Sequence, residues 1–297
     1  MIKLPERQRI QAMLAGTLQE WFKQRCGSKG AALAFYTLFS MAPMLILVIA
    51  IAGAVFGEQA ARGEIVGQLS GLIGSTGADA IQLLLAAAHS NRSGPLAALI
   101  ALAVLLVGAT TVFSELKDSL DEIWYVPITR HSGFVGLVRT RLLSFGLILV
   151  LAFLLLTSLV VSAALALLAK YLGGMWISVT VVVSPLSQLF SFAVIASLFA
   201  SIYKMLPQVK LPWRDVWIGS IGTAALFVLG KYLIGIYLGN SGVASSYGAA
   251  GSVIALLLWI YYSAQIFFFG AQFTRQYALF FGSLQNKEAG HLATPAS

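Results

Sequence analysis

Charged residues are scarce in this sequence. Only 10% of its 297 residues are Asp, Glu, Lys or Arg, whereas 59% are hydrophobic. A soluble protein carries about 25% charged residues, so this composition excludes a water-soluble globule. We predict an integral membrane protein, and the stretches between its apolar runs are too short to fold a separate catalytic domain.

Cysteine and histidine are also scarce. The single cysteine, Cys26, cannot form an intramolecular disulfide. The three histidines, His89, His131 and His291, lack the spacing of metal ligands. No nucleophile triad, P-loop or dinucleotide-binding pattern is present. The sequence therefore predicts no catalytic residue, no metal site and no cofactor, and we expect a protein that is not an enzyme.

Six apolar runs dominate what is present. Each is near or above the about 20 residues that cross a hydrocarbon core of about 30 Å. They lie at about residues 31–56, 95–114, 142–169, 176–203, 213–238 and 247–273. The predicted fold class is all-α, a polytopic bundle of six transmembrane helices with amphipathic interfacial helices. Its parts are a cytoplasmic amphipathic segment (1–30), the six-helix domain (31–280) and a polar tail (281–297).

Basic residues are distributed unevenly around these runs. Of the 19 Lys and Arg, 15 lie in the N-terminal segment, in the second and fourth loops and after the sixth run, and 4 lie in the alternate regions. Cytoplasmic loops carry the excess of positive charge, so we expect both termini in the cytoplasm. The formal net charge of +8 comes from 19 Lys and Arg against 11 Asp and Glu, and it does not by itself indicate a nucleic-acid partner.

The segment before the first run has the pattern of an amphipathic helix. We expect this helix to lie under an anionic leaflet, most simply as a positioning anchor. Its apolar residues at helical spacing are Ile10, Met13, Leu14, Leu18, Trp21 and Phe22, and its polar side has Arg7, Arg9, Glu20, Lys23 and Arg25.

The loop at 57–94 is long and semi-apolar. A Gly-Ser-Thr-Gly sequence at 74–77 separates two apolar clusters, which predicts two short amphipathic helices at the outer face. They either roof the bundle, which we favour, or shape a lateral opening for an amphiphile.

The acidic cluster of the sequence is Glu115, Asp118, Asp121 and Glu122. On a helix, Glu115, Asp118 and Glu122 share one face and apolar residues occupy the opposite face. This pattern favours a solvated extension of the second span over a metal site.

The centres of the six runs contain no ionisable side chain, so a proton relay of buried carboxylates is not predicted. Two prolines, Pro43 and Pro185, each remove a backbone hydrogen bond. Breaks at membrane depth face protein or a water-lined cavity, and a structural kink explains either proline equally well. The candidate residues of a substrate path are Tyr36, Ser40, Pro43, Ser184, Pro185, Gln188, Asn240, Tyr247, Gly248, Gly251, Gln265 and Gln272.

Small residues and two amides complete the pattern. Gly219, Gly222 and Gly230 predict close packing of the fifth span against a neighbour, and the Gly/Ser-rich stretch at 239–252 is either a packing element or a re-entrant turn. Gln265 and Gln272 are two helical turns apart on one face. They either line a path where spans one, four and six meet, or pack in the core.

These residues resemble the YihY/BrkB family of bacterial inner-membrane proteins, once labelled ribonuclease BN. The similarity covers nearly the whole chain, at Ala34–Pro43, Asp118–Trp124, Ser246–Ser252, Leu257–Ser263 and Gly270–Phe273. The family commonly has Glu at the position of Gln272 and Asn at that of Asp121. The resemblance implies a six-helix protein of the bacterial inner membrane, often described as a transporter. The residues above give the ribonuclease label no support.

We expect a transporter or flippase-like protein, not driven by ATP, that moves an envelope lipid or other amphiphile, with membrane lipids as its partners. One alternative is a small-solute or ion exporter. Another is a structural scaffold of an envelope-biogenesis complex without a substrate of its own. A homo-oligomer or an envelope-assembly partner is compatible with each of these.

Overall fold

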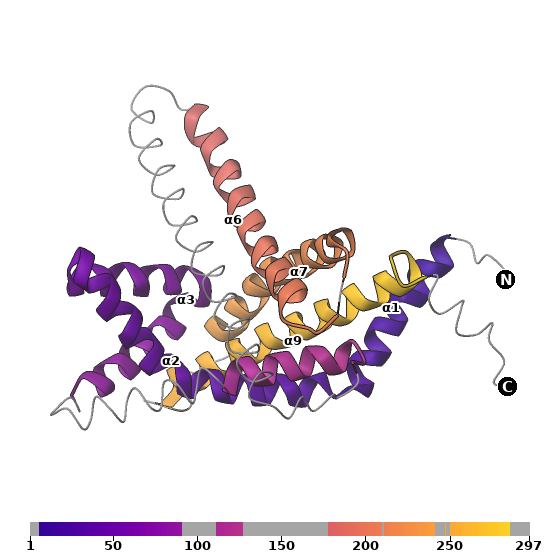
Figure 1. The fold of residues 1–297 in the computed structure, drawn as a ribbon. Coiled ribbons are helices and arrows are strands. Elements are labelled where there is room, and N and C mark those ends of the chain that lie inside the picture. Colours follow the sequence, from indigo (N-terminus) through magenta and orange to yellow (C-terminus); the bar gives the residue numbers. More distant parts are fainter. Residues whose placement is uncertain are drawn as a thin grey trace. The chain divides into compact units, whose positions relative to one another are not determined.

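The structure is a computed structural model that describes residues 6–90, 111–126, 178–209, 211–240, 247 and 250–285 (Figure 1). A helical segment occupies residues 111–123, and the described residues contain no strand. Within them the predicted all-α fold is confirmed. The long helices are α1 (Glu6–Lys23), α2 (Cys26–Phe56), α3 (Glu58–Ser90), α6 (Ser178–Met205), α7 (Trp213–Asn240) and α9 (Gly251–Phe280).

Three segments of the described helices are long and apolar enough to cross a membrane. They are Pro185–Met205 in α6, Trp213–Leu238 in α7 and Gly251–Phe280 in α9, and they match the last three predicted spans. The predicted span at 142–169 lies outside the described residues, as does most of that at 95–114. The remaining one, 31–56, is helical throughout as part of α2. The count of six spans stays a prediction.

Pro43 and Pro185 lie inside helices that continue through them. Of the two interpretations that the sequence allows, a break in the helix is therefore wrong at both positions, and a structural kink stays open. A proline removes one hydrogen bond and kinks a helix, but the bonds of the neighbouring turns carry the helix on.

The segment after α2 corrects a second expectation. One helix, α3, runs through the Gly-Ser-Thr-Gly sequence at 74–77, where the sequence predicts two. Glycine costs a helix only about 1 kcal/mol relative to alanine, and burial on a neighbouring helix offsets such a cost. Ala80, Ile81 and Leu85 of α3 provide that burial in a core shared with α2.

Gly57 separates α2 from α3. Its φ of 87° lies in the left-handed region, which glycine adopts without a steric cost. Its N–H donates to the Gly53 carbonyl at 2.9 Å, so the end of α2 is capped.

The described contacts group the chain into two compact units. Unit 1 has Met1–Gln24, Leu120–Leu226 and Phe269–Ser297, and unit 2 has Arg25–Ser119 and Phe227–Phe268. The core of unit 2 joins side chains of α2, α3 and the first half of α9. Its buried members are Ala34, Leu45, Ile49, Ala80, Ile81, Leu85, Leu256 and Ile260.

In unit 1, α7 approaches α9 closely, as the small residues predict. A Cβ atom added to Gly219 would lie 1.9 Å from Oγ1 of Thr274, and one added to Gly270 would lie 2.1 Å from Oγ1 of Thr223. The hydroxyl of Tyr203, from α6, lies 3.3 Å from Oγ1 of Thr223. The three helices therefore meet at a seam of glycines and hydroxyls, as is typical of membrane helices.

Candidate functional site

The first helix lies against the C-terminal half of α9 in unit 1. The Arg9 guanidinium donates to the Phe280 carbonyl and lies 4.6 Å from the ring centroid of Phe281. Further along α1, a Cβ atom at Gly16 would lie 3.3 Å from Oε1 of Gln276. These contacts run in opposite directions along the two helices, so α1 and α9 are antiparallel where they touch.

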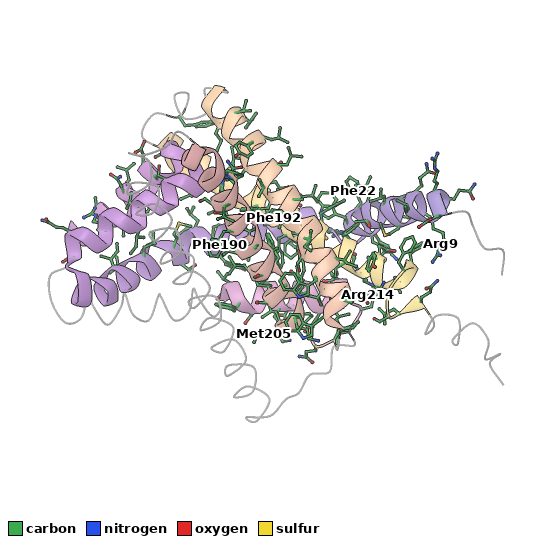
Figure 2. All side chains as sticks on the ribbon, turned by 90° about the horizontal axis from the view of Figure 1, so that it is seen from above. Arg9, Phe22, Phe190, Phe192, Met205 and Arg214 are labelled. Atoms are coloured by element: carbon green, nitrogen blue, oxygen red, sulfur yellow. The ribbon has the colours of Figure 1, made fainter. Side chains whose placement is uncertain are left out.

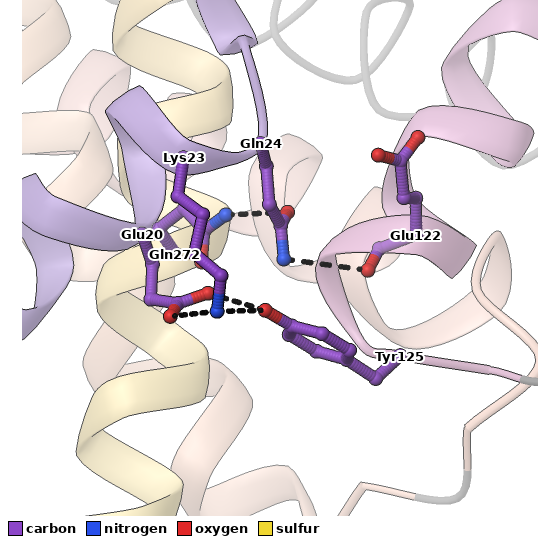
Figure 3. A network of polar contacts seen from close by, with 6 residues as sticks. All are labelled: Glu20, Lys23, Gln24, Glu122, Tyr125 and Gln272. Atoms are coloured by element: carbon purple, nitrogen blue, oxygen red, sulfur yellow. Dashed lines mark hydrogen bonds and ion pairs between the residues drawn. The ribbon is translucent and has the colours of Figure 1, made fainter.

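A chain of two amide side chains joins three elements at the end of α1 (Figure 3). Gln272 of α9 is fully buried, and its Nε2 donates to Oε1 of Gln24 at 2.7 Å. Gln24 lies in the turn after α1, and its Nε2 donates to the Glu122 carbonyl at 3.5 Å. We call Gln24, Gln272 and the Glu122 carbonyl the amide clasp. Its last acceptor, Oε1 of Gln272, is buried and has no hydrogen-bond partner among the described residues.

An ionic cluster lies beside the clasp in Figure 3. The hydroxyl of Tyr125 donates to Oε2 of Glu20 at 2.6 Å, and Nζ of Lys23 lies 3.1 Å from Oε1 of the same carboxylate. The Arg275 guanidinium lies 4.5 Å from the ring centroid of Tyr125. We call Glu20, Lys23, Tyr125 and Arg275 the tyrosine cluster.

The backbone of Tyr125 is in an uncommon conformation. Its φ is 52°, in the left-handed region, where a bulky residue costs of order 1–3 kcal/mol. Such a conformation persists when its surroundings hold it. Contacts of the Tyr125 side chain with Glu20, Lys23 and Arg275 supply that restraint.

Charges within the tyrosine cluster stabilise one another. Burial alone would raise the pKa of Glu20, but the hydrogen bonds from Tyr125 and Lys23 and the charges of Lys23 and Arg275 outweigh it, so this pKa lies below its usual value. Hydrogen bonds with Tyr125 and Glu20 and the Glu20 charge raise the pKa of Lys23. Glu20 and Lys23 are therefore both ionised at neutral pH.

The second amide of α9 lies in unit 2. Gln265 is half-buried, and its Nε2 lies 3.5 Å from the Gly27 carbonyl of α2. A Cβ atom at Gly30 would lie 1.9 Å from that Nε2, so the glycine leaves room for the amide. Oε1 of Gln265 is buried without a hydrogen-bond partner in the described ranges. Both glutamines lie on α9 two turns apart, as predicted, and both contact protein.

The other candidate residues are dispersed. Ser40 is buried, but its Oγ donates to the Thr37 carbonyl of its own helix at 3.1 Å, and Tyr36 is half-buried. Gln188 and Pro185 on α6 are exposed, as is Tyr247. No described contact joins these side chains to Gln265 or Gln272.

Three more candidates are placed by backbone position, and a fourth is not described. Gly251 begins α9 and is buried. Ser184 lies in α6, Asn240 ends α7, and Gly248 lies outside the described residues. Whether the stretch at 239–252 is re-entrant therefore stays open. The residues of α2 that lie at Gln265, Gly27 and Gly30, precede the predicted first span, which meets α9 instead in the apolar core of unit 2. In unit 1, Tyr203 of the fourth span lies near Gly270 of α9.

The acidic helical segment has the faces that the sequence predicts. Asp118 and Glu122 are exposed, whereas Leu120 and Ile123 are buried. No group of potential metal ligands occurs in the part of the chain that the structure describes.

Asp121 has a role that sequence reasoning missed. Its Oδ1 accepts a hydrogen bond from the N–H of Gln208 at 2.7 Å, so it holds the turn after α6. The sequence contains one indication of this role: on a helix, Asp121 lies off the face that Glu115, Asp118 and Glu122 share.

The apolar residues of α1 also differ from the prediction of one face. Met13 is buried, whereas Ile10, Leu14, Leu18 and Phe22 are exposed. Packing on α9 explains the difference, because it covers the side of α1 that carries Met13 and Thr17.

Together, the apolar helices and the buried polar contacts define an all-α integral membrane protein. Residues 17–290 match the protein family described as Virulence factor BrkB. The chain belongs to this family, as its resemblance implies.

Two relatives named UPF0761 membrane protein illustrate the similarity. One from Verminephrobacter eiseniae is 30% identical over 266 residues, which cover 88% of this chain and 61% of that protein. One from Teredinibacter turnerae is 28% identical over 285 residues, which cover 93% of this chain and 63% of that protein. The chain thus spans about three-fifths of the length of these curated relatives. No solved structure matches it.

Proposed function

We propose that this membrane protein is a transporter or flippase-like protein, not driven by ATP, for an envelope lipid or other amphiphile. The observation that carries the proposal is the polar face of α9. Gln265 and Gln272 each keep a buried amide oxygen without a hydrogen-bond partner among the described residues. An unpaired buried acceptor costs about 1–3 kcal/mol, so such atoms are usually paired with water or a ligand. Hydroxyl or amine groups of a lipid headgroup would supply the missing donors.

The scarcity of acidic side chains in the described spans supports a transport path that does not use a relay of carboxylates. Their one acid is Asp215, near the start of α7, whose Oδ2 accepts from the Ser283 N–H at 2.9 Å. We further propose that the protein is not an enzyme, has no nucleic-acid partner, and lies in the bacterial inner membrane with both termini in the cytoplasm. The distribution of basic residues supports this orientation.

Lipid movement in liposomes tests the proposal. The full chain is reconstituted with phosphatidylethanolamine labelled by a nitrobenzoxadiazole dye, and dithionite then bleaches the dye that reaches the outer leaflet. We expect faster loss of the protected dye than in empty liposomes, and a several-fold slower loss with Gln265→Leu. The matched control is Gln19→Leu, which removes an exposed amide from α1 and should keep the wild-type rate.

Equal rates in protein-containing and empty liposomes would contradict lipid movement. Release of a trapped water-soluble ion without lipid movement would instead support the small-solute exporter.

A scaffold is the second candidate, because Gln272 has no exposed surface and its donor already pairs with Gln24. These are properties of a packed residue. If the protein is a scaffold, we expect Gln265→Leu and Gln272→Leu to change its stability. We then expect neither the wild type nor any variant to move lipid or solute.

A further inference from the structure

One face of α1 is uncovered by the described residues. Its exposed apolar side chains are four residues apart: Ile10 is 43% exposed, Leu14 47%, Leu18 50% and Phe22, labelled in Figure 2, 65%. Residues at this spacing are neighbours on one side of a helix. They form a stripe about 18 Å long, which we call the apolar stripe.

The opposite face of α1 is fixed by packing. Met13 and Thr17 are buried, and Arg9 and Gln24 are bonded to Phe280 and Gln272 of α9. Rotating α1 to bury the apolar stripe would break these contacts. The stripe therefore faces outward.

Cations flank the stripe at both ends and outnumber the acids of α1 by three to two. Arg7 is exposed at its first turn, next to the exposed Glu6, and Lys23 is exposed at its last turn. Glu20, the acid nearest its C-terminal end, is turned to Tyr125 and Lys23. Apolar side chains flanked by cations match the acyl boundary and the phosphates of an anionic leaflet.

We propose that the apolar stripe docks α1 on an anionic lipid surface. Ile10, Leu14, Leu18 and Phe22 enter the boundary between headgroups and acyl chains, and Arg7 and Lys23 lie at the phosphates. This docking does not depend on transport of a lipid.

The test uses the full chain in nanodiscs, at one copy per disc, with an environment-sensitive dye on an introduced cysteine. Cys26→Ala removes the single native cysteine. Leu14→Cys places the dye in the stripe, and the matched control Gln19→Cys places it at an exposed polar position of the same helix. With brominated phosphatidylglycerol in the disc, we expect at least twofold stronger quenching at position 14 than at 19. Pure phosphatidylcholine discs with brominated chains should quench position 14 less.

A charge placed in the stripe gives a second measurement. Leu18→Glu should abolish the quenching at position 14 and change the melting temperature little, because the Leu18 side chain is half exposed. Gln19→Glu should keep the quenching.

Two outcomes would overturn the proposal. A dye at position 14 that stays unquenched in every disc would show that the stripe meets water or another protein. A doubled particle mass in detergent, lost with Leu18→Glu, together with absent quenching, would make the stripe an interface between two copies of this chain.

Discussion

Gly219 and Thr274 meet where α7 and α9 are closest. A Cβ atom at Gly219 would lie 1.9 Å from Oγ1 of Thr274, whereas one at Gly235 would meet nothing within 4 Å. The two glycines lie in the same helix, so they separate the effect of close packing from that of helix propensity.

We expect Gly219→Ala to lower the free energy of unfolding by about 1–3 kcal/mol, because the added methyl group forces the helices apart. Gly235→Ala, the control, should leave stability unchanged or raise it by about 0.5–1 kcal/mol. Cys26 is fully buried, so its reaction with a thiol-reactive dye on heating reports unfolding. Equal melting temperatures for the two variants would show that α7 and α9 have room for the methyl group.

The pKa of Glu20 makes stability depend on pH. Its pKa is lower in the folded protein than the usual 4.5, owing to its contacts with Tyr125, Lys23 and Arg275. A lowered carboxyl pKa stabilises the folded state above the unfolded-state pKa, and this contribution is lost as pH falls through the folded-state pKa. We expect wild type to melt above Glu20→Gln at pH 7, and the difference between the two melting temperatures to shrink as the pH falls below 4.5.

Light scattering on heating measures this dependence without a thiol probe. Tyr125→Phe, which removes the hydrogen bond to Glu20, should move the convergence to higher pH. A constant difference between wild type and Glu20→Gln from pH 7 to 3.5 would contradict the assignment.

The amide clasp connects elements that are far apart in sequence. Gln24 and Gln272 are 248 residues apart, and the pair joins the turn after α1 to α9. Removing one amide leaves the other buried without a partner, at a cost of about 1–3 kcal/mol.

A double-mutant cycle tests this pairing. We expect Gln24→Leu and Gln272→Leu each to destabilise the protein, and the double variant to cost less than the sum by about 0.5–3 kcal/mol. The control cycle pairs Gln24→Leu with Gln188→Leu, whose amide is exposed on α6, and should be additive. Additivity in both cycles would show that the clasp contributes nothing to stability.

The elements show what sequence can and cannot predict. Spans such as 213–238 are predictable because they depend on local composition. The exposed and buried faces of the helical segment at 111–123 are predictable because they depend on helical periodicity. The continuity of α3 depends on Ile81 packing against another helix, which local glycine content does not report. The sequence also predicts that Met13 and Leu14 lie on the same apolar face of α1. Only the position of α9 shows that Met13 is buried and Leu14 is exposed.

Sites are harder to predict for the same reason. The sequence predicts that Gln265 and Gln272 share a face, since both lie on one helix. It does not identify their partners, Gly27 and Gln24, because these are set by tertiary contacts across more than 200 residues.

For the whole molecule, the described residues provide three candidate spans, and the basic residues predict the orientation. Alkaline phosphatase fused after Ser297 should be inactive and a green fluorescent protein there should fluoresce, because the positive-inside rule places this end in the cytoplasm. The matched control is alkaline phosphatase fused after Ser90, the last residue of α3, which should be active if α2 crosses the membrane. An active enzyme after Ser297 would contradict the orientation.

Protein synthesis separates the two halves of the amide clasp in time. At about 5–20 residues per second, Gln272 is made roughly 12–50 s after Gln24. During this interval the inner side of α1, with Met13 and Thr17, has no α9 to cover it. The clasp therefore cannot close before α9 is made, and a chain released before residue 272 keeps that side of α1 open.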